Sequence, residues 1–177
     1  NTGKARIYPQ ALFQLVVDVN LIAPVYWALE MIGRIAEDRA ATGKKRWVPD
    51  EGIQGSVVFI GSISSQGNRG QISYASTKAG LEGAAATIMK EAIFHGVRCG
   101  VIHPGFTDTP MVQSRWTNAD GSTNEAERHS YTETRAAQSP LHTIATPEDQ
   151  SWAMLYHASD ASRFITGQVI RPNGGVV

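Results

Sequence analysis

Apolar residues recur at intervals of three and four along the first part of the chain. This spacing places them on one side of a helix, so it predicts an amphipathic helix that reaches roughly to Ala40. Pro24 lies inside this helix, where a proline removes one backbone hydrogen bond and crowds the carbonyl four residues earlier. We therefore expect a kink that leaves the carbonyl of Asn20 without its usual partner. The residues that share the spacing are Leu12, Leu15, Val16, Val19, Ile22 and Tyr26.

Three short apolar runs predict strands. Residues 56–60 and 97–102 are apolar and rich in β-branched side chains, which is typical of strands buried on both faces of a sheet. Residues 167–171 form a third run, which a Pro-Asn-Gly-Gly sequence closes. Between the first two runs, an alanine-rich helix is predicted from Tyr74 to about His95, with Gly96 as its cap.

A further helix is predicted from Thr146 to about Ser159. Thr146 is followed by a proline and two acidic residues, a combination that favours a helix start. The segment from Thr107 to Ala145 is polar and weakly periodic, so we expect a long loop with room for a short helix. Because helices alternate with strands, the pattern predicts an α/β fold with a parallel sheet.

Composition narrows the class of protein. The 177 residues carry a formal net charge of zero, with 42% hydrophobic and 18% charged residues, as in a soluble single domain. No broad field is available to attract nucleic acid or an anionic membrane, and no uninterrupted apolar run approaches the roughly 20 residues of a bilayer span. The single cysteine, Cys99, suits a reducing cytoplasm. We expect a cytoplasmic protein, residues 1–177 forming one domain, with no nucleic-acid partner, no membrane partner and no catalytic metal.

Tyr74 and Lys78 are one helical turn apart and share a helix face. A phenol, with a pKa near 10, is a poor acid or base at neutral pH, and a nearby ammonium lowers that pKa by stabilising the phenolate. The spacing alone is common in exposed pairs without function. Ser62 strengthens the case, because it ends a buried strand at the sheet edge where open α/β folds place their ligands. A hydroxyl at this edge can donate to a substrate carbonyl.

The chain at this point resembles the short-chain dehydrogenase/reductase family. The ordered matches cover nearly all of the chain except two long loops. They imply a Rossmann-like doubly wound parallel sheet, of which these residues would be the carboxy-terminal portion. The matching segments are the serine loop at 60–64, the Tyr-x-x-x-Lys helix at 70–80, the asparagine segment at 17–20, the Pro-Gly element at 103–109 and the final strand at 166–175.

The resemblance implies an oxidoreductase that interconverts a secondary alcohol and a ketone by hydride transfer with NAD or NADP. Tyr74 would exchange a proton with the substrate oxygen, and Lys78 would lower the pKa of the Tyr74 phenol and hold the nicotinamide ribose. Ser62 would polarise the carbonyl. Asn20 would position a water that joins Lys78 to solvent. The cofactor-binding residues would be Tyr74, Lys78, Pro104, Gly105, Thr107 and Thr109.

The resemblance also implies a substrate lid over residues 107–145 and a small hydroxyl or keto substrate. The helices that carry Asn20 and Tyr74 would form the contacts of a homodimer or homotetramer. The loop between the Asn20 helix and the Ser62 strand is longer than usual, which resembles a bacterial subgroup of 3-ketoacyl-carrier-protein reductases.

Three departures from the family pattern leave alternatives open. Ser62 lies twelve residues before Tyr74, where thirteen is common, so Ser64 stays an alternative polarising residue. The subgroup's longer loop is the second departure. The third is that the glycine-rich phosphate loop, the residue that selects NAD or NADP and the Asn-Asn-Ala-Gly segment do not occur in the sequence.

We expect these 177 residues to be part of a longer polypeptide, with a truncated gene product as the alternative. A truncated member would be an inactive module that dimerises or binds a partner. A dehydratase or epimerase of the extended group is a third hypothesis, which the ending at residues 167–175 and the compact length disfavour.

Overall fold

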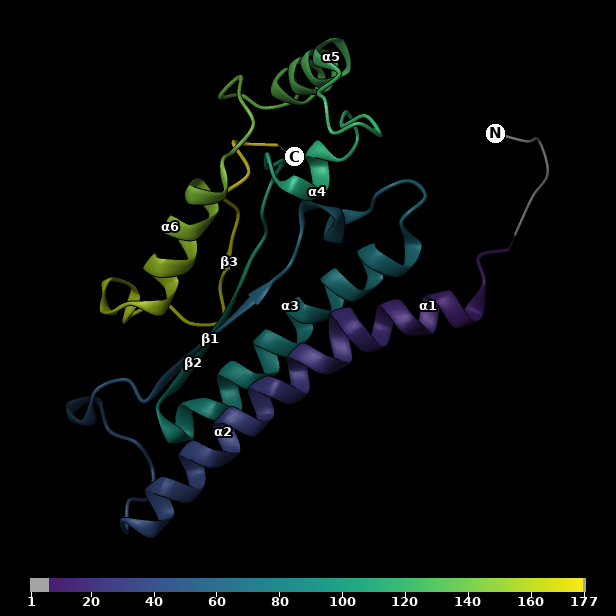
Figure 1. Cartoon of the computed structure of the whole chain (residues 1–177). Helices are drawn as coiled ribbons and strands as arrows, with labels where there is room; N and C mark the ends of the chain where they lie inside the picture. The colour runs from purple at the N-terminus through teal and green to yellow at the C-terminus, as the bar shows by residue number, and fades with distance from the viewer. Residues whose placement is uncertain (1–6, 177) are drawn as a thin grey trace.

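The computed structural model describes residues 7–176 (Figure 1). Within this range one parallel sheet has the strand order β1-β2-β3, formed by Gly55–Ile60, Val97–Ile102 and Val169–Ile170. The helices α2 and α3 lie on one face of the sheet and α6 lies on the other. The predicted α/β fold with a parallel sheet is therefore confirmed.

A long helical rod begins the described part of the chain. It consists of α1 (Gln10–Val17), a π-helical turn (Asp18–Ile22) and α2 (Ala23–Ala41). The amide of Ala23 donates to the carbonyl of Asp18, five residues earlier, so the helix widens at this point. Pro24 follows in the first turn of α2. The helix therefore departs from regular α geometry just before Pro24, and the kink predicted there stays a prediction.

The helix α3 spans Ile72–Ala92 and continues as a 3₁₀ turn, Ile93–His95. Gly96 then adopts the left-handed conformation with φ of 79°, which confirms it as the predicted cap. A Cβ at Gly96 would lie 2.4 Å from the indole of Trp47. Gly80, further up the helix, would place a Cβ 3.1 Å from Leu21 in the π turn, so α3 and the rod are closely packed.

The strands differ in how deeply they are buried. All six residues of β2 are buried, as predicted. In β1, only Val57 and Phe59 are buried, while Ile60 is 39% exposed. The prediction that β1 is buried on both faces is therefore wrong. Among the described residues β1 is an edge strand, so it has a sheet neighbour on one side only.

The third strand is shorter than the sequence predicts. Only Val169 and Ile170 pair with β2, at Val101 and Ile102. Gly167, at φ of 69°, is in the left-handed region, which is incompatible with a regular strand. Pro172 follows at the other end and has no amide to donate.

The segment after β2 contains more helix than predicted. Helix α4 spans Pro110–Gln113 and α5 spans Glu125–Ala136. None of the α5 residues is buried, and its sequence is mostly polar, so no apolar stripe reveals the helix. The side chain of Asn124 caps α5 by accepting from the Glu127 amide. Helix α6, Pro147–Ala158, begins with the predicted Thr146 cap, which Asp149 completes as a capping box.

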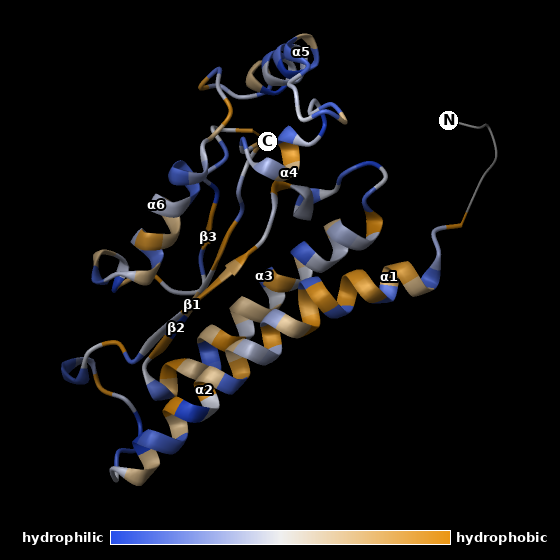
Figure 2. Ribbon diagram, viewed as in Figure 1, coloured by the Kyte–Doolittle hydropathy of each residue, from blue (hydrophilic) through white to orange (hydrophobic). Residues whose placement is uncertain are grey.

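The rod presents a large apolar surface to the outside (Figure 2). Val19, Tyr26 and Trp27 are 61%, 65% and 81% exposed. By length and composition alone residues 10–41 resemble a membrane-spanning helix, and 6% of its most apolar window is buried. The expectation from the sequence considered only uninterrupted apolar runs, none of which approaches the length of a bilayer span. The rod as a whole does reach that length. A surface of this kind indicates contact with another molecule.

An ion pair fixes the far end of the rod to the loop before β1. Arg39, which is 4% exposed, places Nη1 2.7 Å from Oε2 of Glu51, and its Nη2 donates to the carbonyl of Lys45 at 3.1 Å. The hydrogen bonds from Arg39 lower the pKa of the Glu51 carboxyl to about 2. The loop over residues 42–54 is thereby held against the helix.

Replacing Glu51 by glutamine should lower the free energy of unfolding at neutral pH. The ordinary pKa of the carboxyl is 4.5, so its stabilising contribution is complete above that pH and is lost as the pH falls toward about 2. Urea unfolding of both proteins from pH 7 to pH 2.5 should show the difference shrinking below pH 4.5. Glu37→Gln, an exposed change on α2, serves as the control. A difference that is the same at every pH would contradict this role for Glu51.

Candidate active site

Ser62 lies at the carboxyl end of β1, as the sequence predicts. Its backbone is extended, and its Oγ accepts a hydrogen bond from the amide of Ser64 at 3.1 Å. This bond caps a 3₁₀ turn, Ile63–Gln66, which we call the serine turn. Ser64 is 7% exposed, and its Oγ donates to the side chain of Gln71 and accepts from that of Asn68, both at 3.2 Å. Ser62 is the more accessible of the two serines.

Tyr74 and Lys78 are half-buried on the first turns of α3. The Nζ atom of Lys78 lies 5.6 Å from the centroid of the Tyr74 ring. The same Nζ donates to the carbonyl of Ile60 at 2.6 Å. Because Ile60 is the last residue of β1, this bond joins the Tyr74 helix to the strand end that leads to Ser62. Burial lowers the pKa of the Lys78 ammonium.

Asn20 lies in the π turn of the rod. Its side-chain amide donates to the carbonyl of Val16 at 3.2 Å, so it is engaged within its own helix. The π turn packs against α3, where Leu21 meets Gly80. The structure therefore places the Asn20 segment beside the Tyr74 helix, and within residues 7–176 no hydrogen bond joins Asn20 to Lys78 directly.

The Pro-Gly element follows β2 at the same sheet edge. A Cβ at Gly105 would lie 2.6 Å from Cα of Asn173, so this close approach requires glycine. The Oγ1 of Thr107 donates to the carbonyl of Gly105 at 3.1 Å. Thr109 precedes α4, and its carbonyl accepts from two amides of that helix. Pro104, between β2 and Gly105, is half-buried.

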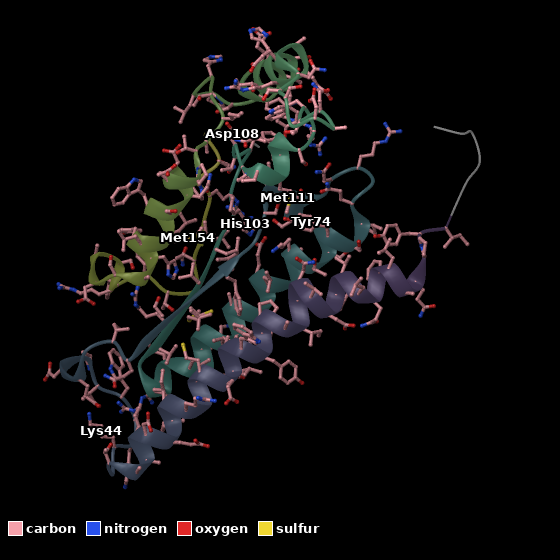
Figure 3. All side chains as sticks on the ribbon, in the orientation of Figure 1. Lys44, Tyr74, His103, Asp108, Met111 and Met154 are labelled. Atoms are coloured by element: carbon pink, nitrogen blue, oxygen red, sulfur yellow. The ribbon has the colours of Figure 1, made fainter. Side chains whose placement is uncertain are left out.

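Two hollows flank this edge of the sheet. One, of about 350 Å³, is lined by Ile63, Ser64 and Val176 among others, and the other, of about 250 Å³, is lined by Phe106 and Asn173 among others. Neither hollow is lined by Tyr74 or Lys78. Figure 3 labels Tyr74 near the amino end of α3 and His103 at the end of β2.

His103 lies at the same sheet edge, and the sequence analysis did not single it out. It is fully buried directly after β2, with Nδ1 3.1 Å from Oγ of Ser65 and Nε2 3.3 Å from Oε1 of Glu82. Burial lowers the pKa of the imidazole, the Glu82 carboxylate opposes that shift, and the charges of Arg171 and Lys78 add to it. The available signal was a polar residue placed directly after a fully buried strand.

Replacing Lys78 by methionine should make the pH dependence of stability weaker above neutral pH. Because burial lowers the pKa of Lys78, the unfolded chain binds this proton more tightly, and wild-type stability rises as the pH approaches the ordinary value of 10.5. The stability of the variant relative to the wild type should therefore be highest near pH 7 and fall toward pH 10.5. Chemical unfolding across this range measures it, with the exposed Lys90→Met as control. A constant difference would argue against a buried Lys78 ammonium.

Comparison with known proteins connects this arrangement to a family. A profile of the family described as Enoyl-(Acyl carrier protein) reductase matches residues 8–177. The chain is 36% identical over 124 residues to 3-oxoacyl-[acyl-carrier-protein] reductase FabG of Thermotoga maritima, covering 70% of this chain and 46% of that protein. It is 30% identical over 166 residues to the reductase of the same name from Rickettsia conorii, covering 93% of this chain and 58% of that one.

The solved structures show the same fold. A 4-hydroxyisoleucine dehydrogenase complexed with NADH matches with a TM-score of 0.77 and 25% identity, over 96% of this chain and 60% of that one. This match confirms the predicted Rossmann-like α/β fold. The chain spans about half the length of the curated relatives it matches. Because the family profile covers all but the first seven residues, the chain belongs to the short-chain dehydrogenase/reductase family.

Proposed function

We propose that the protein carrying this chain is an NAD- or NADP-dependent oxidoreductase that interconverts a secondary alcohol and a ketone, with a ketoacyl or similar keto substrate. The observation that carries the proposal is the placement of the Lys78 ammonium, 5.6 Å from the Tyr74 ring and bonded to the end of the strand that leads to Ser62. The names of the relatives, which include 3-oxoacyl-[acyl-carrier-protein] reductases, support the substrate class.

In the direction of reduction, the phenol of Tyr74 gives its proton to the ketone oxygen and becomes a phenolate. The half-buried Lys78 ammonium stabilises that negative charge, because a nearby opposite charge acts strongly where solvent is partly excluded. In the direction of oxidation, the phenolate takes the proton from the alcohol. A bound nicotinamide supplies or accepts the hydride.

Ser62 is the residue that we propose to polarise the substrate carbonyl. Its Oγ accepts from the amide of Ser64, which leaves the hydroxyl proton available for a substrate oxygen. The Ser64 hydroxyl, by contrast, is buried and already donates to Gln71. The geometry thus favours Ser62 over Ser64 in spite of the shorter spacing to Tyr74.

The residues present fit the nicotinamide end of the cofactor. An ammonium has three donors, and Lys78 uses one on Ile60, which leaves two for a ribose hydroxyl and a water. Asn20, in the packed π turn beside α3, would hold such a water. The half-buried turn of Pro104 and Gly105, with Thr107 and Thr109, would contact the nicotinamide amide. The phosphates would be held by further polypeptide of the kind that the longer relatives contain.

Residues 107–145 are the proposed substrate lid. Thr107 and Ala145 pair in a parallel bridge, so both ends of the segment are held at the sheet edge. The α5 helix within it has no buried residue. A segment anchored at its base, with an exposed helix within it, can move over a site without disturbing the sheet.

Replacing Tyr74 by phenylalanine should lower kcat by a factor of about 100 or more, because the variant lacks the transferred proton. The assay follows nicotinamide absorbance with a 3-ketoacyl thioester and with a 3-hydroxyacyl thioester. Cofactor affinity, measured by fluorescence titration, should change little because the ring remains. Tyr156→Phe, on α6, is the matched control. Retained turnover in the Tyr74 variant would remove this residue from its role, and the absence of cofactor binding to the wild type would favour an inactive binding module.

The exposed apolar face of the rod is the proposed subunit contact. Replacing Leu15 and Val19, 56% and 61% exposed, by glutamate should convert a dimer or tetramer into smaller species, because buried charges without partners are unfavourable. Light scattering after size-exclusion chromatography in detergent-free buffer measures the mass. Met111→Glu, which is 84% exposed on α4, is the control. A wild type that is monomeric, or that requires detergent, would contradict the proposal.

A further inference from the structure

His103 occupies a space that exists because residue 61 is glycine. A Cβ at Gly61 would lie 2.4 Å from Cδ2 of His103 and 2.9 Å from the side chain of Val101. The imidazole therefore lies directly against the peptide between Ile60, whose carbonyl holds Lys78, and Ser62, the proposed polarising residue. A shift of this ring would move the strand end.

The two ring nitrogens of His103 reach two other parts of the site. Nδ1 lies 3.1 Å from Oγ of Ser65 in the serine turn. Nε2 lies 3.3 Å from the carboxylate of Glu82, one helical turn beyond Lys78 on α3. The backbone amide of His103 donates to the carbonyl of Ile170 at 2.8 Å, so the residue itself is held by β3.

The charges around His103 indicate which tautomer it adopts. Glu82 and Lys78 face it from α3, Ser65 faces it from the serine turn, and Arg171 faces it from the end of β3. Nε2 lies 3.3 Å from the Glu82 carboxylate but forms no hydrogen bond with it, while Nδ1 lies 3.1 Å from the Ser65 hydroxyl and accepts from it in the Nε2–H tautomer. The opposite tautomer would place a lone pair against the carboxylate. The neutral Nε2–H form therefore satisfies the Ser65 hydroxyl and avoids that repulsion, while Nε2 itself makes no hydrogen bond.

We propose that His103 is a positioning residue of the active site, which holds the serine turn and thereby sets the position of the Ser62 hydroxyl relative to Tyr74 and Lys78. This inference rests on the proposed function for its kinetic consequence. Its structural part, that His103 orders the serine turn, can be measured without any turnover.

The kinetic test is a double-mutant cycle between His103 and Ser62. His103→Leu keeps an apolar side chain in the space and removes both nitrogens, so kcat should fall about 10- to 100-fold as the hydroxyl is misplaced. In a Ser62→Ala background, His103→Leu should lower kcat by less than about twofold, because no hydroxyl remains to be positioned. His103→Asn, whose amide reaches the place of Nδ1, should recover most of the loss. Independent, multiplicative effects of the two changes would overturn the proposal.

His157 provides the matched control. It is also fully buried, and it lies against β2, where a Cβ at Gly100 would be 2.0 Å from its Nε2. His157→Leu therefore tests the general cost of removing a buried imidazole from this sheet. Its effect on kcat should be the same with Ser62 present or absent. If His157→Leu couples to Ser62 as strongly as His103→Leu does, the role assigned to His103 is wrong.

Hydrogen exchange separates this inference from the proposed function. In His103→Leu the amides of Ser64 and Ser65, which donate to Ser62 in the serine turn, should exchange at least tenfold faster than in the wild type and in His157→Leu. His103→Asn should restore the slow exchange. This result would support the positioning role even for a protein without turnover. Unchanged exchange in His103→Leu would reject it even for an active enzyme.

Discussion

β2 pairs with a strand on each side, and all six of its residues are buried. The helix and the turn that carry the candidate site residues both pack against this buried strand. The helix α3 packs along β2, so its first turns, which carry Tyr74 and Lys78, lie near the carboxyl end of β2. The chain that leaves β2 can only turn closely against residues 172–174 because Gly105 lacks a side chain. The buried strand thus acts as the reference to which the other groups are positioned.

Much of this arrangement could be predicted from the sequence because the physical signals are local. The Thr146 cap, the Gly96 cap and the apolar run of β2 each depend on neighbouring residues, and all three were confirmed. The π turn could not be predicted, since the spacing of apolar residues across this segment is what a regular α-helix would also show. The α5 helix is held by an end cap and exposed polar pairs, and its mostly polar sequence offers no apolar stripe from which to predict it.

The site shows the same division between local and distant signals. Tyr74, Lys78 and Ser62 could be placed because each sits at a fixed point of a predicted helix or strand, although their roles stay predictions. His103 could not be assigned, because its partners Ser65 and Glu82 come from other elements and become neighbours only in the fold. The exposure of Ile60 was missed for a related reason. An apolar run indicates that a strand becomes buried, but it does not indicate which other element buries each side chain.

The bridge between Thr107 and Ala145 has a consequence for how such a protein can diverge. Residues 107–145 leave the sheet edge and return to it at the same place. The entropic cost of closing a loop grows only slowly with its length. Insertions or substitutions between Thr107 and Ala145 therefore change the surface of this segment while the strand ends keep their spacing. Substrate recognition by residues 107–145 can therefore evolve separately from the chemistry of the residues at the strand ends.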